Sequence, residues 1–176
     1  MSKILIIAAA AMLFLMNVHV HAASPDELND LEIAHVAYTA DSIDIRYAHL
    51  ALAKSTNPAI HTFARTMIRD HSALNERALA LLRKLGASAQ DNFLSRQLNS
   101  QADKLVEEMS RLSSSDFDRR YAANELGYHR AVNRLVEKTF IPNLKNGEVK
   151  ALFVLALEIF KAHEHHAEMM TTSLGE

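Results

Sequence analysis

The chain has no cysteine and no tryptophan, and its 176 residues include only four glycines and three prolines. Without cysteine, the protein forms no disulfide, offers no thiol nucleophile and carries no lipid anchor on cysteine. So few glycines and prolines do not supply the many turns of a β-sheet protein. The abundant residues are helix formers such as alanine and leucine, so the sequence predicts an all-α protein.

Several functional motifs are missing as well. The sequence contains no glycine-rich phosphate loop and no nucleophile elbow. Its formal net charge is only −2, and residues of both signs are mixed along the chain. We therefore expect no nucleic-acid partner and no basic face for anionic lipid.

The first 22 residues are typical of a secretory signal peptide. Lys3 precedes an apolar run from Ile4 to Met16, and small residues follow it. The apolar run is short for a membrane span, so we expect cleavage after Ala22 and no transmembrane anchor afterwards. Residues 23–176 would then form one domain in the periplasm or outside the cell.

Apolar periodicity predicts four long helices and a shorter one. The expected spans are 24–54, 57–86, a short helix between 86 and 117, 116–140 and 148–170. Ser24-Pro25 and Asn57-Pro58 are N-terminal capping signals, and Ser115 with Asp118 resembles a capping box. Gly86 suits the C-terminal end of the second helix, and Pro142 is expected in the turn before the last helix.

This order of helices is the connectivity of a ferritin-like four-helix bundle with a shorter crossover helix. The second and third long helices should then run parallel, from the end where the first and last helices finish. The inward faces are expected to include Leu31, Tyr38, Asp41 and Ile45 in the first helix and Leu152, Leu155, Ile159 and His163 in the last. Counting residues from the common end puts Asp41, His71, His129 and Glu158 at one level, with Asp44, Glu125 and His163 about one turn nearer that end.

His71 is the only ionisable residue in the apolar stripe of the second helix. An unpartnered polar group in a core costs about 1 to 3 kcal/mol, so other helices should supply partners for this imidazole. Their inward faces offer carboxylates and imidazoles but no Lys or Arg, which indicates a metal site. The candidate ligands are Asp41, Asp44, His71, Glu125, His129, Glu158, His163 and His166.

Two alternatives stay open at this point. A single core histidine is more often satisfied by a backbone carbonyl or a tyrosine, and shared protons can hold a His–carboxylate network together without metal. If a metal binds, such a ligand set suits Fe, Mn, Zn or Cu without selecting one. His163, His166, Met169 and Met170 also form a copper-tolerant set, although we favour core filling as the role of the methionines.

Several local sequences resemble a known family. The segments are Phe63-Ala64, Met67-Ile68-Arg69-Asp70-His71, Phe117-Asp118 with Tyr121, His129 and His163. They are similar to those of the secreted ferritin-like family called domain of unknown function 4142, and the resemblance extends from about Leu31 to Met170. It implies an exported helical bundle of the ferritin-like type, but no settled biochemical activity.

The sequence departs from the ferritins themselves in its ligand motifs. Di-iron carboxylate bundles take a Glu-x-x-His motif from each of two helices, and that motif is absent here. From the inward-facing histidines and carboxylates, we expect an exported metal-binding protein that acts in metal handling or in defence against oxidative or metal stress. The alternative is a structural or partner-binding bundle with a metal-free network, and an enzyme ranks third. Protein partners and homo-oligomers are left open.

Overall fold

The computed structural model describes residues 24–175, and all regular structure in that range is helical. The elements are η1 (Pro25–Glu27), α1 (Asp30–Lys54), α2 (Pro58–Lys84), α3 (Phe93–Ser110), α4 (Ser114–Leu135), η2 (Val136–Phe140), α5 (Ile141–Asn143) and α6 (Gly147–Gly175). The expected all-α class is confirmed. The expected signal peptide, residues 1–22, lies outside the described residues.

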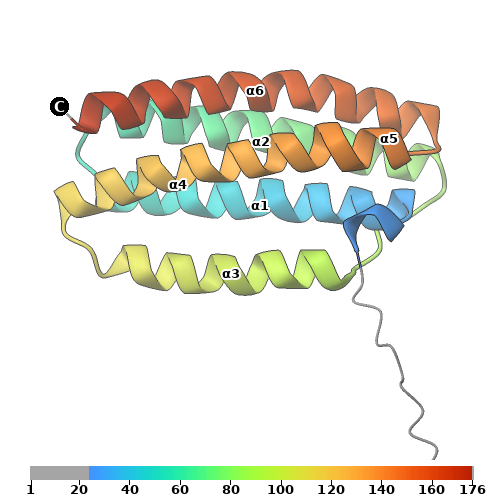
Figure 1. Cartoon of the computed structure of the whole chain (residues 1–176), viewed down its shortest axis with the longest axis horizontal. Helices are drawn as coiled ribbons and strands as arrows, with labels where there is room; N and C mark the ends of the chain where they lie inside the picture. The colour runs from blue at the N-terminus through green and yellow to red at the C-terminus, as the bar shows by residue number, and fades with distance from the viewer. Residues whose placement is uncertain (1–23, 176) are drawn as a thin grey trace, which may run out of the picture.

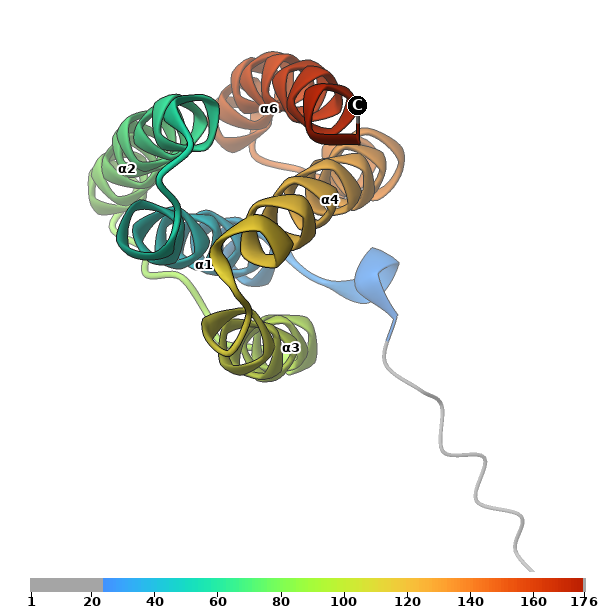
Figure 2. The same ribbon diagram turned by 90° about the vertical axis from the view of Figure 1, so that its left-hand side faces the viewer.

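The long helices lie side by side along one axis (Figure 1). Helices α2 and α4 start at the end where α1 and α6 finish, so they run parallel as expected. Figure 2 shows α1, α2, α6 and α4 around a common centre, with α3 outside the ring beside α1. Helix α1 packs against α2, α3 and α4, and α6 packs against α2 and α4. Between residues 24 and 175, no helix combines the length and hydropathy needed to cross a membrane.

Two predicted helix starts are wrong, and side-chain capping explains the first. Ser24 begins only the short 3-10 turn η1, whereas α1 begins after Asn29, whose side chain accepts hydrogen bonds from two backbone N–H groups of the first turn. Helix α4 begins after Ser113 rather than at the predicted Ser115–Asp118 box, and Ser113 Oγ donates to Asp116 at 2.7 Å. Asn57 and the left-handed Gly86 cap α2 as predicted.

The end of α4 also differs from expectation. Residues Val136–Phe140 form a π-helical turn, and Pro142 lies in the helical turn α5 that follows it. Proline has no N–H to continue the α-helical hydrogen bonding, whereas Ile141 N–H donates to the carbonyl of Val136. Helix α6 continues past the predicted Met170 to Gly175.

The inward faces of α2 and α4 match the prediction, but those of α1 and α6 are rotated. Tyr38 is 37% exposed and Leu155 is 46% exposed, although both were expected inside. Helix α1 is packed by helices on several sides, and residues 151–157 of α6 are all apolar, so periodicity alone did not select one face.

The core has two apolar ends. One end is built around Ile60, Met67, Phe117 and Tyr121, and the other around Ile33, Val36, Phe140 and Phe153. In α1, α2, α4 and α6, most of the buried ionisable residues lie between the segments that supply these two clusters, whereas Asp118 lies beside Phe117 within one of them. The fold therefore encloses a polar layer between two apolar ones.

Candidate metal centre

Six buried ionisable residues from four helices meet in this polar layer. They are Asp41 and Asp44 of α1, His71 of α2, Glu125 and His129 of α4, and His163 of α6. None of them is more than 6% exposed. The ring centroids of His71 and His129 are 5.9 Å apart, and His163 lies 5.2 Å from His71 and 5.4 Å from His129. The convergence expected from helix heights is confirmed for these six residues.

Each histidine of the layer is held through one ring nitrogen. His71 Nδ1 lies 2.7 Å from Asp41 Oδ1, and His129 Nδ1 lies 2.9 Å from the backbone carbonyl oxygen of Glu125. His163 Nε2 lies 3.0 Å from Asp70 Oδ2. The other nitrogens, His71 Nε2, His129 Nε2 and His163 Nδ1, are buried and make no hydrogen bond among the described residues. Metal-binding histidines have this arrangement, in which the second nitrogen fixes the ring and its tautomer.

The carboxylates Asp44 and Glu125 lie against these rings. Asp44 Oδ2 is 2.9 Å from His71 Nε2 and 3.3 Å from His129 Nε2. Both contacts are within ion-pair distance, but neither has the geometry of a hydrogen bond. Glu125 Oε2 likewise has no hydrogen-bond partner within the described part of the chain. Donor atoms of His71, His129 and His163 lie within 4.8 Å of one another, and so do those of Asp44, Glu125 and His129. His129 belongs to both groups of three.

Burial and mutual charge set the protonation of the layer. Burial opposes ionisation of Asp44, but the charge of the nearby His71 outweighs it and lowers the Asp44 pKa to about 2. Burial and the Asp44 charge raise the pKa of Glu125 well above its ordinary value, which favours the protonated acid. Burial lowers the pKa of His163 to about 4, so its ring is neutral at pH 7.

His71 behaves differently from the other two histidines. Burial opposes its charge, but Asp44 and Asp41 together raise its pKa well above the ordinary value. Burial lowers the pKa of His129, with Asp44 opposing the effect only in part. The metal-free layer thus contains a protonated His71, which lies between two carboxyl groups. It also contains two neutral imidazoles, those of His129 and His163, and neutral imidazole is the form in which histidine binds metal.

One protein-family model, described as "Domain of unknown function (DUF4142)", matches residues 17–170. The chain belongs to this family. The resemblance found in the local sequences is thereby confirmed, and the matched region includes every residue of the polar layer. Comparisons with curated proteins and with solved structures give no match.

In this DUF4142 chain, Asp70 is a functional candidate that the helical stripe did not include. It lies one residue before His71 and points to a different side of α2, where it accepts a hydrogen bond from His163 and two from Arg69. Asp70 is partly exposed, so it links the buried ring of His163 to the surface. The adjacent Asp70-His71 pair was the available signal, but only the position of α6 reveals the partner.

Glu158 and His166 do not join the polar layer of this family member. Both side chains are exposed, so their expected inward positions are wrong. The buried face of α6 runs through Phe160, His163 and Ala167, which turns Glu158 and His166 toward its edges. They line a surface groove between α2 and α6, whose floor includes Asp70 and His163.

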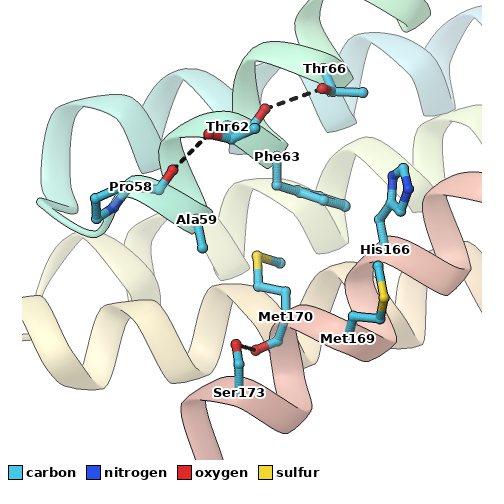
Figure 3. Close-up of a pocket in the computed structure, with 9 residues that line it drawn as sticks. All are labelled: Pro58, Ala59, Thr62, Phe63, Thr66, His166, Met169, Met170 and Ser173. Carbon is cyan, nitrogen blue, oxygen red and sulfur yellow. Dashed lines mark hydrogen bonds between the residues drawn. The ribbon is translucent and has the colours of Figure 1, made fainter.

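The copper-tolerant set of α6 is also divided between core and surface. His163 and Met170 are buried, whereas His166 and Met169 are exposed, the latter by 51%. Figure 3 shows His166, Met169 and Met170 along a groove with the first turns of α2. Met170 packs in the apolar cluster around Phe63, in the filling role that we favoured.

Proposed function

We propose that this protein is an exported ferritin-like bundle that binds a divalent transition metal in its core. Its cellular role is metal handling or defence against oxidative or metal stress. The ferritin-like assignment is supported by the parallel directions of α2 and α4 and by the shorter helix α3, which connects them in the chain. The proposed compartment is the periplasm or the exterior, on the basis of the signal-like first 22 residues.

The observation that supports a metal most directly is the orientation of the three histidines. Each ring donates a hydrogen bond through one nitrogen to Asp41, to Asp70 or to the Glu125 carbonyl, and its other nitrogen is buried without a hydrogen bond among the described groups. An unsatisfied buried polar atom costs about 1 to 3 kcal/mol. The charge of Asp44, whose Oδ2 lies 2.9 Å from His71 Nε2 and 3.3 Å from His129 Nε2, offsets part of this cost for two of the three nitrogens. A cation bound to these nitrogens removes that cost.

The proposed ligands are His71, His129 and His163 with Asp44, and Glu125 at the same face. Asp41 and Asp70 orient the rings of His71 and His163. Three imidazoles and one or two carboxylates suit Zn, Fe, Mn or Cu, and this set is richer in histidine than di-iron carboxylate sites. We therefore do not assign oxygen-activating di-iron chemistry.

The competing function is a structural bundle whose polar layer shares protons instead of binding metal. The raised pKa of His71 favours this alternative, because a protonated ring between Asp41 and Asp44 satisfies part of their charge. In that case the outer helical faces would carry the function by binding a partner. Metal affinity of the core distinguishes the two functions.

The test compares metal binding and stability in two variants. Glu125→Gln keeps the size and hydrogen-bond donor of a protonated Glu125 but removes its ability to bind as an anion. His71→Leu removes a proposed ligand from the layer. If the layer is a metal site, both variants should lose metal affinity, His71→Leu by at least about 100-fold, on the scale of a lost metal–imidazole contact.

Metal content after purification, titration calorimetry and urea unfolding of the metal-free forms provide the measurements. Glu125→Gln should leave the free energy of unfolding of the metal-free protein within about 1 kcal/mol of the wild type, because an acid is replaced by a similar amide. Unchanged metal stoichiometry and affinity in His71→Leu would contradict the metal site and favour the proton-sharing network.

A further inference from the structure

A second internal space borders the polar layer at Asp41. It is a cavity of about 260 Å³ between α1, α3 and α4, closed on its inner side by Phe160 of α6. Its walls are mainly apolar, and they include Val36, Tyr128 and Phe140. The π-helical turn contributes two of the lining residues, Val136 and Phe140, so the departure of this turn from α-helical geometry helps to shape the cavity.

One carboxylic acid, Asp41, lies among the lining residues, whose other polar groups belong to Tyr47, Gln101, Asn124 and Tyr128. Asp41 lines it and is only 6% exposed, whereas Gln101 and Ala131, which also line it, are exposed at the surface. The cavity therefore leads from the surface to Asp41. Asp41 uses Oδ1 for its hydrogen bond with His71, and a carboxylate has a second oxygen that can accept another hydrogen bond.

These walls restrict the chemistry of an occupant. An anion would lose its hydration in this apolar space and would also be repelled by the carboxylate of Asp41. An apolar cavity of about 150 Å³ holds benzene, so this one has room for one ring and small substituents. The rings of Tyr128, Phe140 and Phe160 favour an aromatic occupant.

We propose that this cavity binds a small neutral phenol, with its ring between α1, α3 and α4 and its hydroxyl group donating a hydrogen bond to Asp41. The site is separate from the proposed metal ligands and does not require a bound metal. Because Asp41 also holds His71, an occupant here would contact the polar layer through Asp41 and lie one residue away from the proposed ligand His71.

Phenol is the probe, titrated by calorimetry into the full chain in the presence of a chelator. We expect saturable binding at one site per chain. Toluene has the same ring without the hydroxyl, and it should bind about ten-fold more weakly because it leaves the hydrogen bond to Asp41 unmade. Equal affinity for toluene and phenol, or the absence of saturable phenol binding, would overturn the proposal.

Two substitutions test the location. Ala131→Phe fills the mouth of the cavity from an exposed position, and Ala40→Leu fills its inner part. Each should weaken phenol binding at least about ten-fold. Ala80→Phe adds the same ring as Ala131→Phe at an exposed position of α2 outside the cavity lining, and it should bind phenol like the wild type. Unchanged affinity in the folded Ala131→Phe variant would place the binding elsewhere and reject the site.

Discussion

The apolar end of the core around Phe117 and the polar layer around His129 are equally buried but differ in how their atoms are satisfied. Phe117 is fully buried and stacks on Tyr121, with ring centroids 5.9 Å apart. His129 is 1% exposed, yet its Nε2 makes no hydrogen bond among the described residues. The apolar end is stabilised mainly by buried apolar surface, with the Tyr121 hydroxyl as a buried atom that makes no hydrogen bond among the described residues, whereas the polar layer needs protons or a cation. Equal burial therefore does not mean equal contribution to stability.

The largest expected effect lies at the apolar end. Phe117→Ala should lower the free energy of unfolding by about 3 to 5 kcal/mol, because it removes buried apolar surface and leaves a cavity. Metal affinity should stay close to that of the wild type, since Phe117 is not in the polar layer. Urea unfolding and metal titration check both statements. A loss below about 1 kcal/mol would mean that the apolar end contributes little.

Metal addition should raise the free energy of unfolding through the polar layer, whereas Phe117→Ala lowers it at the apolar end. A metal that binds only the folded state, at 100 times its dissociation constant, should stabilise the protein by about 2.7 kcal/mol. A chelator should reverse the shift in thermal or urea unfolding. If unfolding does not respond to chelator or to Zn, Cu, Mn and Fe, shared protons rather than a metal hold the polar layer together, and the proposed function fails.

A smaller effect should follow from loss of ring orientation. Asp70→Asn keeps the size of the side chain but weakens the acceptor for His163 Nε2, so metal affinity should fall about 10- to 100-fold. The matched control is Asp103→Asn, which changes an exposed carboxylate paired with Arg46. Calorimetric titration of both variants should separate them. Equal affinities would exclude an orienting role for Asp70.

The smallest effect is expected at the surface. Arg120 pairs with Glu108 at 2.7 Å, between α4 and α3, and both side chains are exposed. Arg120→Gln should change the free energy of unfolding by less than about 1 kcal/mol, and less still at high salt, because water and ions screen the pair. A change in metal affinity would show that the polar layer responds to distant packing as well as to its own ligands.

Much of the polar layer could be predicted because α2 and α4 have sharply divided faces. His71 and Glu125 each interrupt an apolar stripe, and residue counts along antiparallel and parallel helices place them at similar heights. Glu158 was misplaced because α6 is apolar on several sides at residues 151–157. A small error in helix phase is enough to move a side chain from the core to the surface.

The sequence by itself determined the all-α class, the caps of α2 and the four-helix origin of the buried histidines and carboxylates, because these follow from local propensity and periodicity. The tertiary structure alone decided the partners of the His71 and His163 rings, whereas His129 bonds a carbonyl four residues earlier in its own helix. Asp70 meets His163 only because α6 lies against its side of α2, and the cavity beside Asp41 exists only because α3 packs outside α1. Such contacts join residues far apart in the chain, so no local pattern encodes them.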